Sequence, residues 1–231
     1  MRRLAVFDVD GTLTATNAVD DECFLRAVSH VLGVPIQSFS YANALHATDS
    51  YISRWLCEQH RGEAPSDAEV DRITERFVAE LRAELERAPS RFAPIPGAVG
   101  LFEVLRERDW HVAVATGGWG PSARLKLAAA GIEGPDLIFA CATDALTRTD
   151  IVRLAIERAT TRSGPFDRVV SVGDRPWDVR TAAELSLPFV GVGSGDKAEA
   201  MRAAGATTVL DDLRARDAVL AALSAAMVPG A

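Results

Sequence analysis

The stretch LAVFDVDGTLT, residues 4–14, places two acidic residues directly after an apolar run of strand length. Its first four residues are apolar, and Asp8 and Asp10 follow one residue apart, with Gly11 directly after them. Two carboxylates this close repel each other, and their removal from water is costly. We therefore expect a cation beside them or a proton on one of them, and either arrangement indicates a reactive site.

The composition is typical of a globular protein with one large domain, or with one domain that carries a smaller insertion. The chain has 231 residues, of which 48% are hydrophobic and 25% charged, so it can form a sizeable core. The net charge of −7 argues against a broad surface for nucleic acid or for anionic membranes. No apolar run has the length of a membrane span. We expect neither nucleic acid nor a membrane as a partner, and the oligomeric state is left open.

The cysteines and the first residues indicate a cytoplasmic protein. The three cysteines, Cys23, Cys57 and Cys141, are widely spaced and form no CxxC pair. This pattern favours neither a disulfide framework nor a zinc site and fits a reducing compartment. The apolar run at residues 4–7 is interrupted by Asp8, which is not typical of a signal peptide.

Short apolar runs of strand length alternate with helical patterns along most of the chain. The runs occupy residues 4–7, 111–115, 137–140, 168–172, 187–192 and, more weakly, 207–210. The helical patterns occupy residues 97–109, 121–131, 149–160 and 212–223. Nearly continuous apolar runs are typical of parallel strands buried on both faces. The alternation therefore predicts an α/β fold with a doubly wound parallel sheet.

One interval interrupts this alternation and predicts an inserted helical domain. No strand signal occurs between Leu13 and about Pro94, whereas helical patterns cover residues 20–33, 49–62 and 66–89. The third pattern begins with Ser66 and Glu69, which have the spacing of a capping box. We expect a core of residues 1–14 and 93–231, and a small all-helical cap of residues 15–92 whose return hinge is the proline-rich segment 92–97.

Polar and acidic residues follow three of the predicted strands. Asp8 and Asp10 follow the first, Thr116 and Gly117 follow the strand at 111–115, and Asp174 with Asp178 follows the strand at 168–172. The carboxyl ends of parallel strands meet at one crevice, where ligands bind. Four carboxylates there favour a hard divalent cation such as Mg²⁺.

The same crevice favours phosphoryl chemistry. The glycines after Thr116 allow backbone N–H groups to approach an anion closely. An aspartate is ordinarily ionised at neutral pH, so it can attack phosphorus without a base. A second aspartate, crowded by other carboxylates, can then carry the proton.

The motifs DVDGTLT (8–14), VATGG (114–118) and GDRPWDV (173–179), in this order, resemble the haloacid dehalogenase (HAD) superfamily of phosphohydrolases. The insertion resembles the first, helical type of cap in that family, and phosphoglycolate phosphatase-like members are similar throughout. The resemblance implies a Rossmann-like core, with Asp8 as nucleophile and Asp10 as general acid/base. It also implies that Thr116 and Gly117 hold the phosphoryl group. Mg²⁺ would be bound by Asp8, the backbone carbonyl of Asp10, Asp174 and Asp178.

The sequence departs from the family at its usual lysine. Lys126 and Lys197 are the only lysines. Lys126 lies within the helical pattern after Thr116, and Lys197 follows the last site loop. Arg148 is the cation at the start of the expected helix, and its planar fork suits phosphate oxygens. We therefore expect Arg148 to replace the lysine, with Arg175 as the rival cation, and His46 of the cap to contact the substrate.

The leading hypothesis is a Mg²⁺-dependent phosphatase acting on a small phosphorylated metabolite. A sugar phosphomutase would keep both aspartates and is the alternative enzyme, whereas a binding module for a phosphometabolite is the non-catalytic alternative. A dehalogenase does not need Asp10. A phosphonate-cleaving enzyme needs a cap lysine, and none lies between residues 15 and 92.

Overall fold

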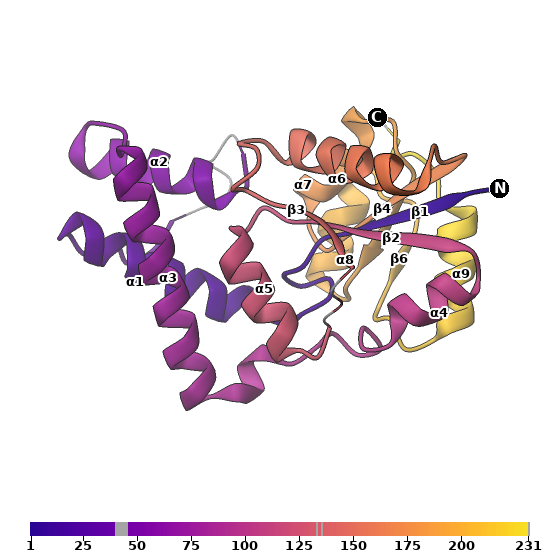
Figure 1. Ribbon diagram of the computed structural model, residues 1–231, viewed down its shortest axis with the longest axis horizontal. Coiled ribbons are helices and arrows are strands. Elements are labelled where there is room, and N and C mark those ends of the chain that lie inside the picture. Colours follow the sequence, from indigo (N-terminus) through magenta and orange to yellow (C-terminus); the bar gives the residue numbers. More distant parts are fainter. Residues whose placement is uncertain (40–45, 133, 135, 231) are drawn as a thin grey trace.

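The computed structural model describes residues 1–39, 46–132, 134 and 136–230. A six-stranded parallel sheet forms the core, with the strand order β3-β2-β1-β4-β5-β6. The strands are β1 (Arg3–Phe7), β2 (Trp110–Ala115), β3 (Ile138–Ala140), β4 (Arg168–Gly173), β5 (Phe189–Val192) and β6 (Val209–Leu210). Each strand lies within or beside an apolar run of the sequence, so the predicted α/β fold with a parallel sheet is confirmed (Figure 1).

Within the described part of the chain, six helices accompany the sheet. They are α4 (Leu101–Glu107), α5 (Gly120–Ala129), α6 (Arg148–Ser163), α7 (Pro176–Glu184), α8 (Asp196–Ala203) and α9 (Arg216–Ala225). Helix α4 is shorter than the predicted helix at 97–109, because Gly97 and Gly100 have left-handed backbone angles (φ 88° and 71°) that a right-handed helix excludes. None of the helical patterns in the sequence corresponds to α7 or α8.

Strand β1 lies inside the sheet, between β2 and β4, and its side chains alternate between two cores. Ala5 and Phe7 belong to the core that includes α4 and α9, whereas Leu4 and Val6 belong to the core that includes α6. All four side chains are buried, which explains the continuous apolar run. Because β1 is an inner strand, the residues after it lie beside those that follow its two neighbours.

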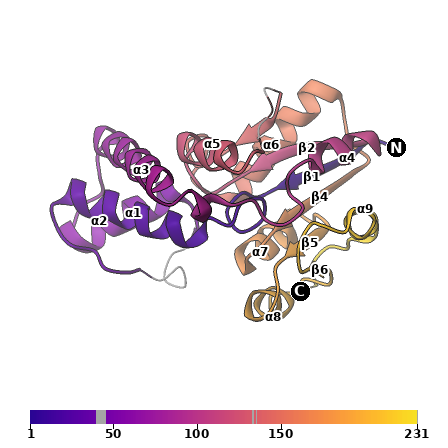
Figure 2. The ribbon, with the colours of Figure 1, turned by 90° about the horizontal axis from the view of Figure 1, so that it is seen from below.

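The segment between β1 and β2 contains three long helices that lie to one side of the sheet (Figures 1 and 2). They are α1 (Asn17–Leu32), α2 (Asp49–Arg61) and α3 (Asp67–Arg87), and the short 3-10 helix η2 (Pro89–Phe92) follows them. Ser66 and Glu69 form the predicted capping box of α3. No strand occurs among the residues described between positions 15 and 92.

Two connecting segments join these helices to the sheet, and they run side by side. The backbone N–H of Ala15 donates to the carbonyl of Ala93 at 2.8 Å, and that of Ile95 donates to the carbonyl of Leu13 at 2.9 Å. These two hydrogen bonds lie at the predicted boundaries between core and cap, next to residues 14 and 93. They support the predicted division of the chain into core and cap, which stays a prediction.

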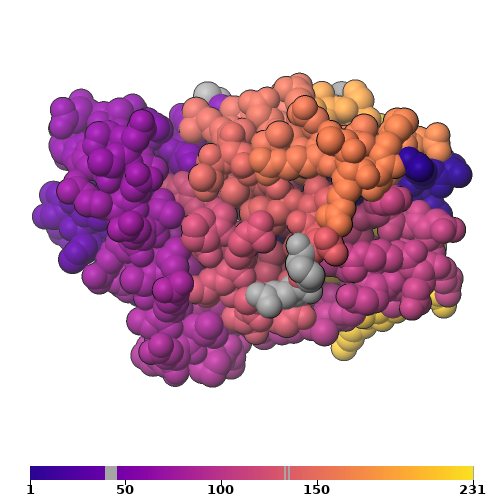
Figure 3. All heavy atoms as spheres, viewed as in Figure 1, coloured from indigo at the N-terminus to yellow at the C-terminus, as the bar shows by residue number. Residues whose placement is uncertain are grey.

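The cap packs directly against the core (Figure 3). The hydroxyl of Thr48 donates to the carbonyl of Leu146 at 2.8 Å, and that of Ser50 donates to the carbonyl of Ala142 at 2.7 Å. The Phe24 ring of α1 also lies 5.7 Å from the ring of Trp119, which belongs to the core. Among the helices described, none has the length and apolar character needed to cross a membrane.

Candidate active site

A cavity of about 60 Å³ lies where the ends of β1, β2 and β4 meet the cap. Six of the residues predicted for the site line it: Asp8, Asp10, Thr116, Gly117, Arg148 and Asp174. The opposite wall comes from cap residues, which include Asp20 and Asp49. The structure therefore brings together side chains that the sequence places more than 160 residues apart.

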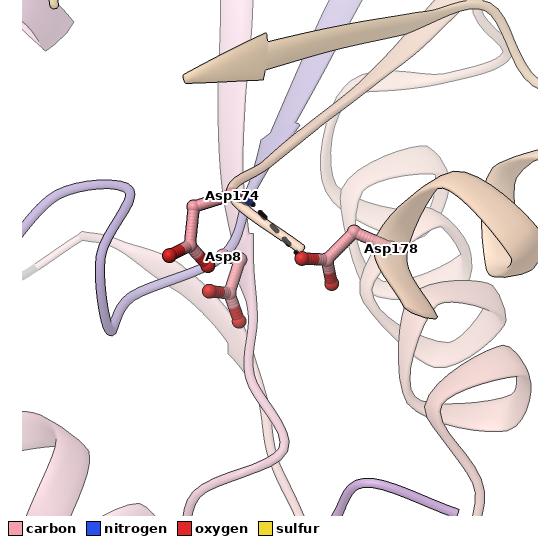
Figure 4. Close-up of side chains that lie close together, drawn as sticks. All are labelled: Asp8, Asp174 and Asp178. Carbon is pink, nitrogen blue, oxygen red and sulfur yellow. Dashed lines mark hydrogen bonds between the residues drawn. The ribbon is translucent and has the colours of Figure 1, made fainter. Parts of the chain in front are cut away.

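Three buried carboxylates form the centre of the site (Figure 4). Asp8, Asp174 and Asp178 each offer an oxygen, and these oxygens lie within 4.8 Å of one another. One oxygen of Asp178 accepts hydrogen bonds from the backbone N–H groups of Asp174 (3.2 Å) and Arg175 (3.1 Å). Clustered carboxylate oxygens are the donors that Mg²⁺ prefers, so these residues fit the predicted ion.

The charges of this cluster are only partly balanced by protein groups. Burial raises the pKa of Asp8 to about 8, the charges of Asp178 and Asp174 add to this effect, and Arg148 opposes it. Burial likewise raises the pKa of Asp174. Burial and like charges thus favour the protonated form of Asp8 in the bare cluster, whereas an aspartate in water is ionised at neutral pH. A divalent cation would favour ionisation, which is a second reason that the cluster fits one.

Arg148 is the cation that contacts the predicted nucleophile. It is the first residue of α6, and its Nη2 lies 2.8 Å from Oδ1 of Asp8. The same nitrogen also donates to Asp178, and Nη1 donates to the carbonyl of Ala47 in the cap at 3.2 Å. Burial alone would lower the pKa of Arg148, but these carboxylates raise it, so the guanidinium stays charged. That Arg148 replaces the family's lysine stays a prediction.

Arg175, the rival cation, contacts a different carboxylate, that of Asp174. Its Nε is 3.4 Å from Oδ2 of Asp174, and its guanidinium lies over the ring of Trp177, 5.6 Å from the ring centre. About a third of the side chain is exposed. Both arginines line the cavity, but only Arg148 has a described contact with Asp8.

Both lysines reach the site, although their positions in the sequence did not suggest it. Nζ of Lys197 lies 2.7 Å from Oδ2 of Asp174, and the Asn17 side-chain amide donates to the same oxygen at 3.0 Å. Lys126, in α5, is fully buried, and its Nζ lies 2.6 Å from Oδ2 of Asp10. Lys126 also donates to Asp20 of the cap.

Asp10 is held on both carboxylate oxygens. Lys126 contacts Oδ2, and the hydroxyl of Thr16 donates to Oδ1 at 2.5 Å. Burial by itself would lower the pKa of Lys126, but the charges of Asp10, Asp20 and Asp49 outweigh burial and raise it. A permanent cation therefore lies against the predicted general acid/base.

The loop after β2 carries Thr116 and Gly117 and is braced by the cap. The hydroxyl of Thr116 is buried and accepts the N–H of Gly118 at 3.1 Å. The backbone N–H of Asp49 donates to the carbonyl of Gly117 at 2.8 Å, and the Asp49 carboxylate accepts the N–H of Trp119 at 2.8 Å. Burial raises the pKa of Asp49 to about 7 against the opposing charge of Lys126. The start of α2 thus holds the loop in place.

His46 is not among the described residues that line the cavity. Its ring packs edge-on against Tyr51, 5.1 Å between ring centres, whereas the next three residues of the chain do line the cavity. A substrate contact of His46 stays a prediction. Asp49, at the start of the amphipathic helix α2, contacts the loop that carries Thr116 and Gly117.

Gly11 allows the turn after β1 to approach Asp174. Its φ of 84° is left-handed, and an added Cβ would lie 2.0 Å from Oδ2 of Asp174. We expect Gly11→Ala to weaken Mg²⁺ binding about 10- to 100-fold, because it displaces a candidate ligand. Titration calorimetry measures this affinity. Gly62→Ala is the matched control, since Gly62 has a φ of 83° and an added Cβ would meet nothing within 4 Å.

The backbone strain of these two variants is similar, about 1–2 kcal/mol each. Thermal unfolding should therefore show a strain cost in both proteins, while only Gly11→Ala loses affinity for the ion. An unchanged Mg²⁺ affinity in Gly11→Ala would show that Asp174 does not bind the metal.

Known proteins share this fold and this sequence pattern. The family model "haloacid dehalogenase-like hydrolase" matches residues 3–185. A phosphoglycolate phosphatase of Agrobacterium fabrum is 26% identical over 92% of this chain and 89% of its own. The tyrosine-protein kinase PtkA of Mycobacterium tuberculosis is 31% identical over 84% of this chain, which spans 62% of that protein. A crystal structure of a hydrolase from Pseudomonas syringae, 20% identical, has a TM-score of 0.72 and covers 94% of this chain and 97% of that one.

The matched region begins at β1 and extends to the end of α7, so it contains every residue of the carboxylate cluster and both contacts of Arg148 with that cluster. The motifs that carried the resemblance therefore lie inside the family match. The chain belongs to the haloacid dehalogenase-like hydrolase family.

Proposed function

We propose that this protein is a Mg²⁺-dependent phosphatase that hydrolyses a small phosphorylated metabolite through an aspartyl-phosphate on Asp8. The observation that carries the proposal is the contact of the Arg148 guanidinium with Asp8 inside a cluster of three buried carboxylates. A phosphoryl group brought to Asp8 adds negative charge at this point, and a fixed cation stabilises that charge in the transition state.

The metal would be held by the carboxylates of Asp8, Asp174 and Asp178 and by the backbone carbonyl of Asp10. When bound, it supplies positive charge that relieves the repulsion between Asp8 and the phosphoryl oxygens. Thr116, Gly117 and Arg148 would bind these oxygens.

The chemistry would take place in two displacements at phosphorus. In the first, a carboxylate oxygen of Asp8 forms a bond to phosphorus, the bond to the leaving oxygen breaks, and Asp10 gives that oxygen a proton. In the second, Asp10 takes a proton from water, the water oxygen bonds to phosphorus, and the bond to Asp8 breaks. Orthophosphate leaves, and both aspartates return to their first state.

The small cavity and the cap that lies over it support a small substrate. Cap and core residues together line about 60 Å³, and a closed cap excludes the bulk water that would compete with transfer. The similarity to a phosphoglycolate phosphatase supports a phosphorylated metabolite. We place the protein in the cytoplasm, which the free state of all three cysteines supports.

A panel of phosphorylated metabolites tests this proposal. We expect phosphate release from at least one small monoester with Mg²⁺, and its loss when EDTA removes the ion. Asp8→Asn serves as the blank for contaminating phosphatases. Isomerised sugar phosphate without free phosphate would instead indicate a mutase, and binding without turnover would indicate a non-catalytic module.

A further inference from the structure

We propose that Lys126 is a positioning residue for Asp10: its ammonium holds the Asp10 carboxylate in the cavity and, through Asp20, links that position to the docked cap. The inference rests on the proposed phosphatase function, in which Asp10 moves the proton. It concerns a lysine that lies outside the motifs of the sequence and that the two displacements at phosphorus do not use.

The burial of Lys126 is the first observation. The side chain is fully buried in α5, between apolar neighbours in the sequence ARLKLAAAG (123–131). A buried ammonium is destabilising unless paired charges and hydrogen bonds compensate it. Here the compensation comes from two carboxylates, Asp10 of the core and Asp20 of the cap. Ion pairs with these two carboxylates, and not packing alone, therefore stabilise the buried position of Lys126.

The arrangement around Asp10 is the second observation. Lys126 holds Oδ2 and Thr16 holds Oδ1, so two of the contacts that orient this carboxylate come from different parts of the chain. Thr16 is the residue before α1, and it also contacts the hydroxyl of Thr14 at 2.5 Å. With both oxygens held, rotation of the carboxylate requires the loss of at least one contact. A proton carrier must lie within hydrogen-bond reach of the leaving oxygen, and this pairing restricts where Asp10 can lie.

The contact with Asp20 is the third observation. Asp20 lies in the first turn of α1, and both Asp20 and Asp10 line the cavity. One ammonium thus bridges the core carboxylate that carries the proton and a carboxylate of the cap. If the cap moved away, Lys126 would lose its ion pair with Asp20, and its hold on Asp10 would change. The contact therefore couples the position of the cap to the position of Asp10.

The test compares two substrates that differ in their need for a proton. An alkyl phosphate such as glycerol 2-phosphate needs a protonated leaving group, whereas 4-nitrophenyl phosphate leaves readily without one. Lys126→Met keeps the length of the side chain and removes the charge. Because this variant leaves two partly buried carboxylates without their ammonium partner, the double variant Lys126→Met with Asp20→Asn is made as well, and thermal unfolding confirms that each protein folds.

We expect both Lys126 variants to lose about 10- to 100-fold in kcat with the alkyl phosphate, the size of effect produced by a small misplacement of a catalytic group. With the aryl phosphate, the loss in kcat should be only a few-fold. Asp20→Asn alone keeps the ammonium of Lys126 but removes its charged partner in the cap, so its ratio of alkyl to aryl rates should fall between that of the wild type and that of Lys126→Met.

Lys197→Met is the matched control, because it removes the other lysine from a different carboxylate, Asp174. Its effect should be the same for both substrates. The second comparison places Lys126→Met in an Asp10→Asn background and uses the aryl phosphate. If Lys126 acts through Asp10, its replacement should change this rate little further, since the effects of residues that act as a unit are not additive.

A readout independent of activity tests the link to the cap. Backbone hydrogen exchange in α1 should be faster in Asp20→Asn and in Lys126→Met than in the wild type, without any ligand present. Equal exchange in all three proteins would overturn the coupling between cap and Asp10.

Equal losses with alkyl and aryl phosphates in the Lys126 variants, or a full additional loss in the Asp10→Asn background, would overturn the positioning role while the phosphatase function stood. A wild-type protein that hydrolyses neither substrate nor any member of the metabolite panel would overturn the proposed function and this inference with it.

Discussion

Asp8→Asn is expected to lower turnover by about four to six orders of magnitude, the loss seen when a nucleophile that acts with its partners is removed. The amide has nearly the same volume as the carboxylate but cannot form the acyl phosphate. Steady-state phosphate release with Mg²⁺ measures the loss. Mass spectrometry of protein quenched during turnover should detect a phosphorylated peptide containing Asp8 in the wild type and no such peptide in the variant.

The same substitution should not impair folding. Burial, together with the charges of Asp178 and Asp174 and against the opposing charge of Arg148, raises the pKa of Asp8 to about 8, so the charged form is costly in the bare cluster. We therefore expect the thermal midpoint of Asp8→Asn, without Mg²⁺, to equal or exceed that of the wild type. Asp136→Asn is the control for the chemical change, because Asp136 is an exposed carboxylate. Turnover by Asp8→Asn near the wild-type rate would exclude Asp8 as the nucleophile.

Arg148→Ala is expected to lower kcat/KM by about two to four orders of magnitude. The guanidinium lies 2.8 Å from Oδ1 of Asp8, where the phosphoryl group would develop charge, and removal of one preorganised donor has an effect of this order. Arg148→Lys should recover part of the activity, because it keeps the charge and loses the planar fork. Kinetics at saturating Mg²⁺ measure both variants.

Arg175→Ala is the matched control, because it removes the other guanidinium of the cavity, which contacts Asp174 rather than Asp8. Its loss should be clearly smaller. Since Arg148→Ala also leaves Asp8 and Asp178 without this partner, thermal unfolding of each variant separates a folding defect from a catalytic one. If Arg148→Ala left kcat/KM nearly unchanged and Arg175→Ala lowered it strongly, the catalytic cation would be Arg175 rather than Arg148.

The core of the site could be predicted because its residues are tied to strand ends. In a parallel sheet, the residues that follow neighbouring strands meet at one edge, so the runs before Asp8, Thr116 and Asp174 were enough to bring these side chains together. For these residues the local pattern and the topology of the sheet decide the position. Arg148 was found through the family resemblance instead, which implies a cation at the start of the helix that precedes β4.

The cap and the lysines depended on contacts that no local pattern records. Lys126 and Asp10 are 116 residues apart, and Lys197 and Asp174 are 23 apart. A long side chain can reach several carboxylates from one helix position, so spacing alone does not indicate its partner. The sequence pattern likewise did not indicate that His46 packs against Tyr51, or that Asp49 contacts the loop after β2.

The parallel sheet, the helical insertion and the acidic strand ends could thus be predicted from the residues alone, because hydrophobic periodicity is a property of local residue patterns. The pairing of cations with carboxylates could not, because it depends on the folded protein. Buried charges are stable only where opposite charges lie within a few ångströms, and the packing of the cap on the core sets those distances.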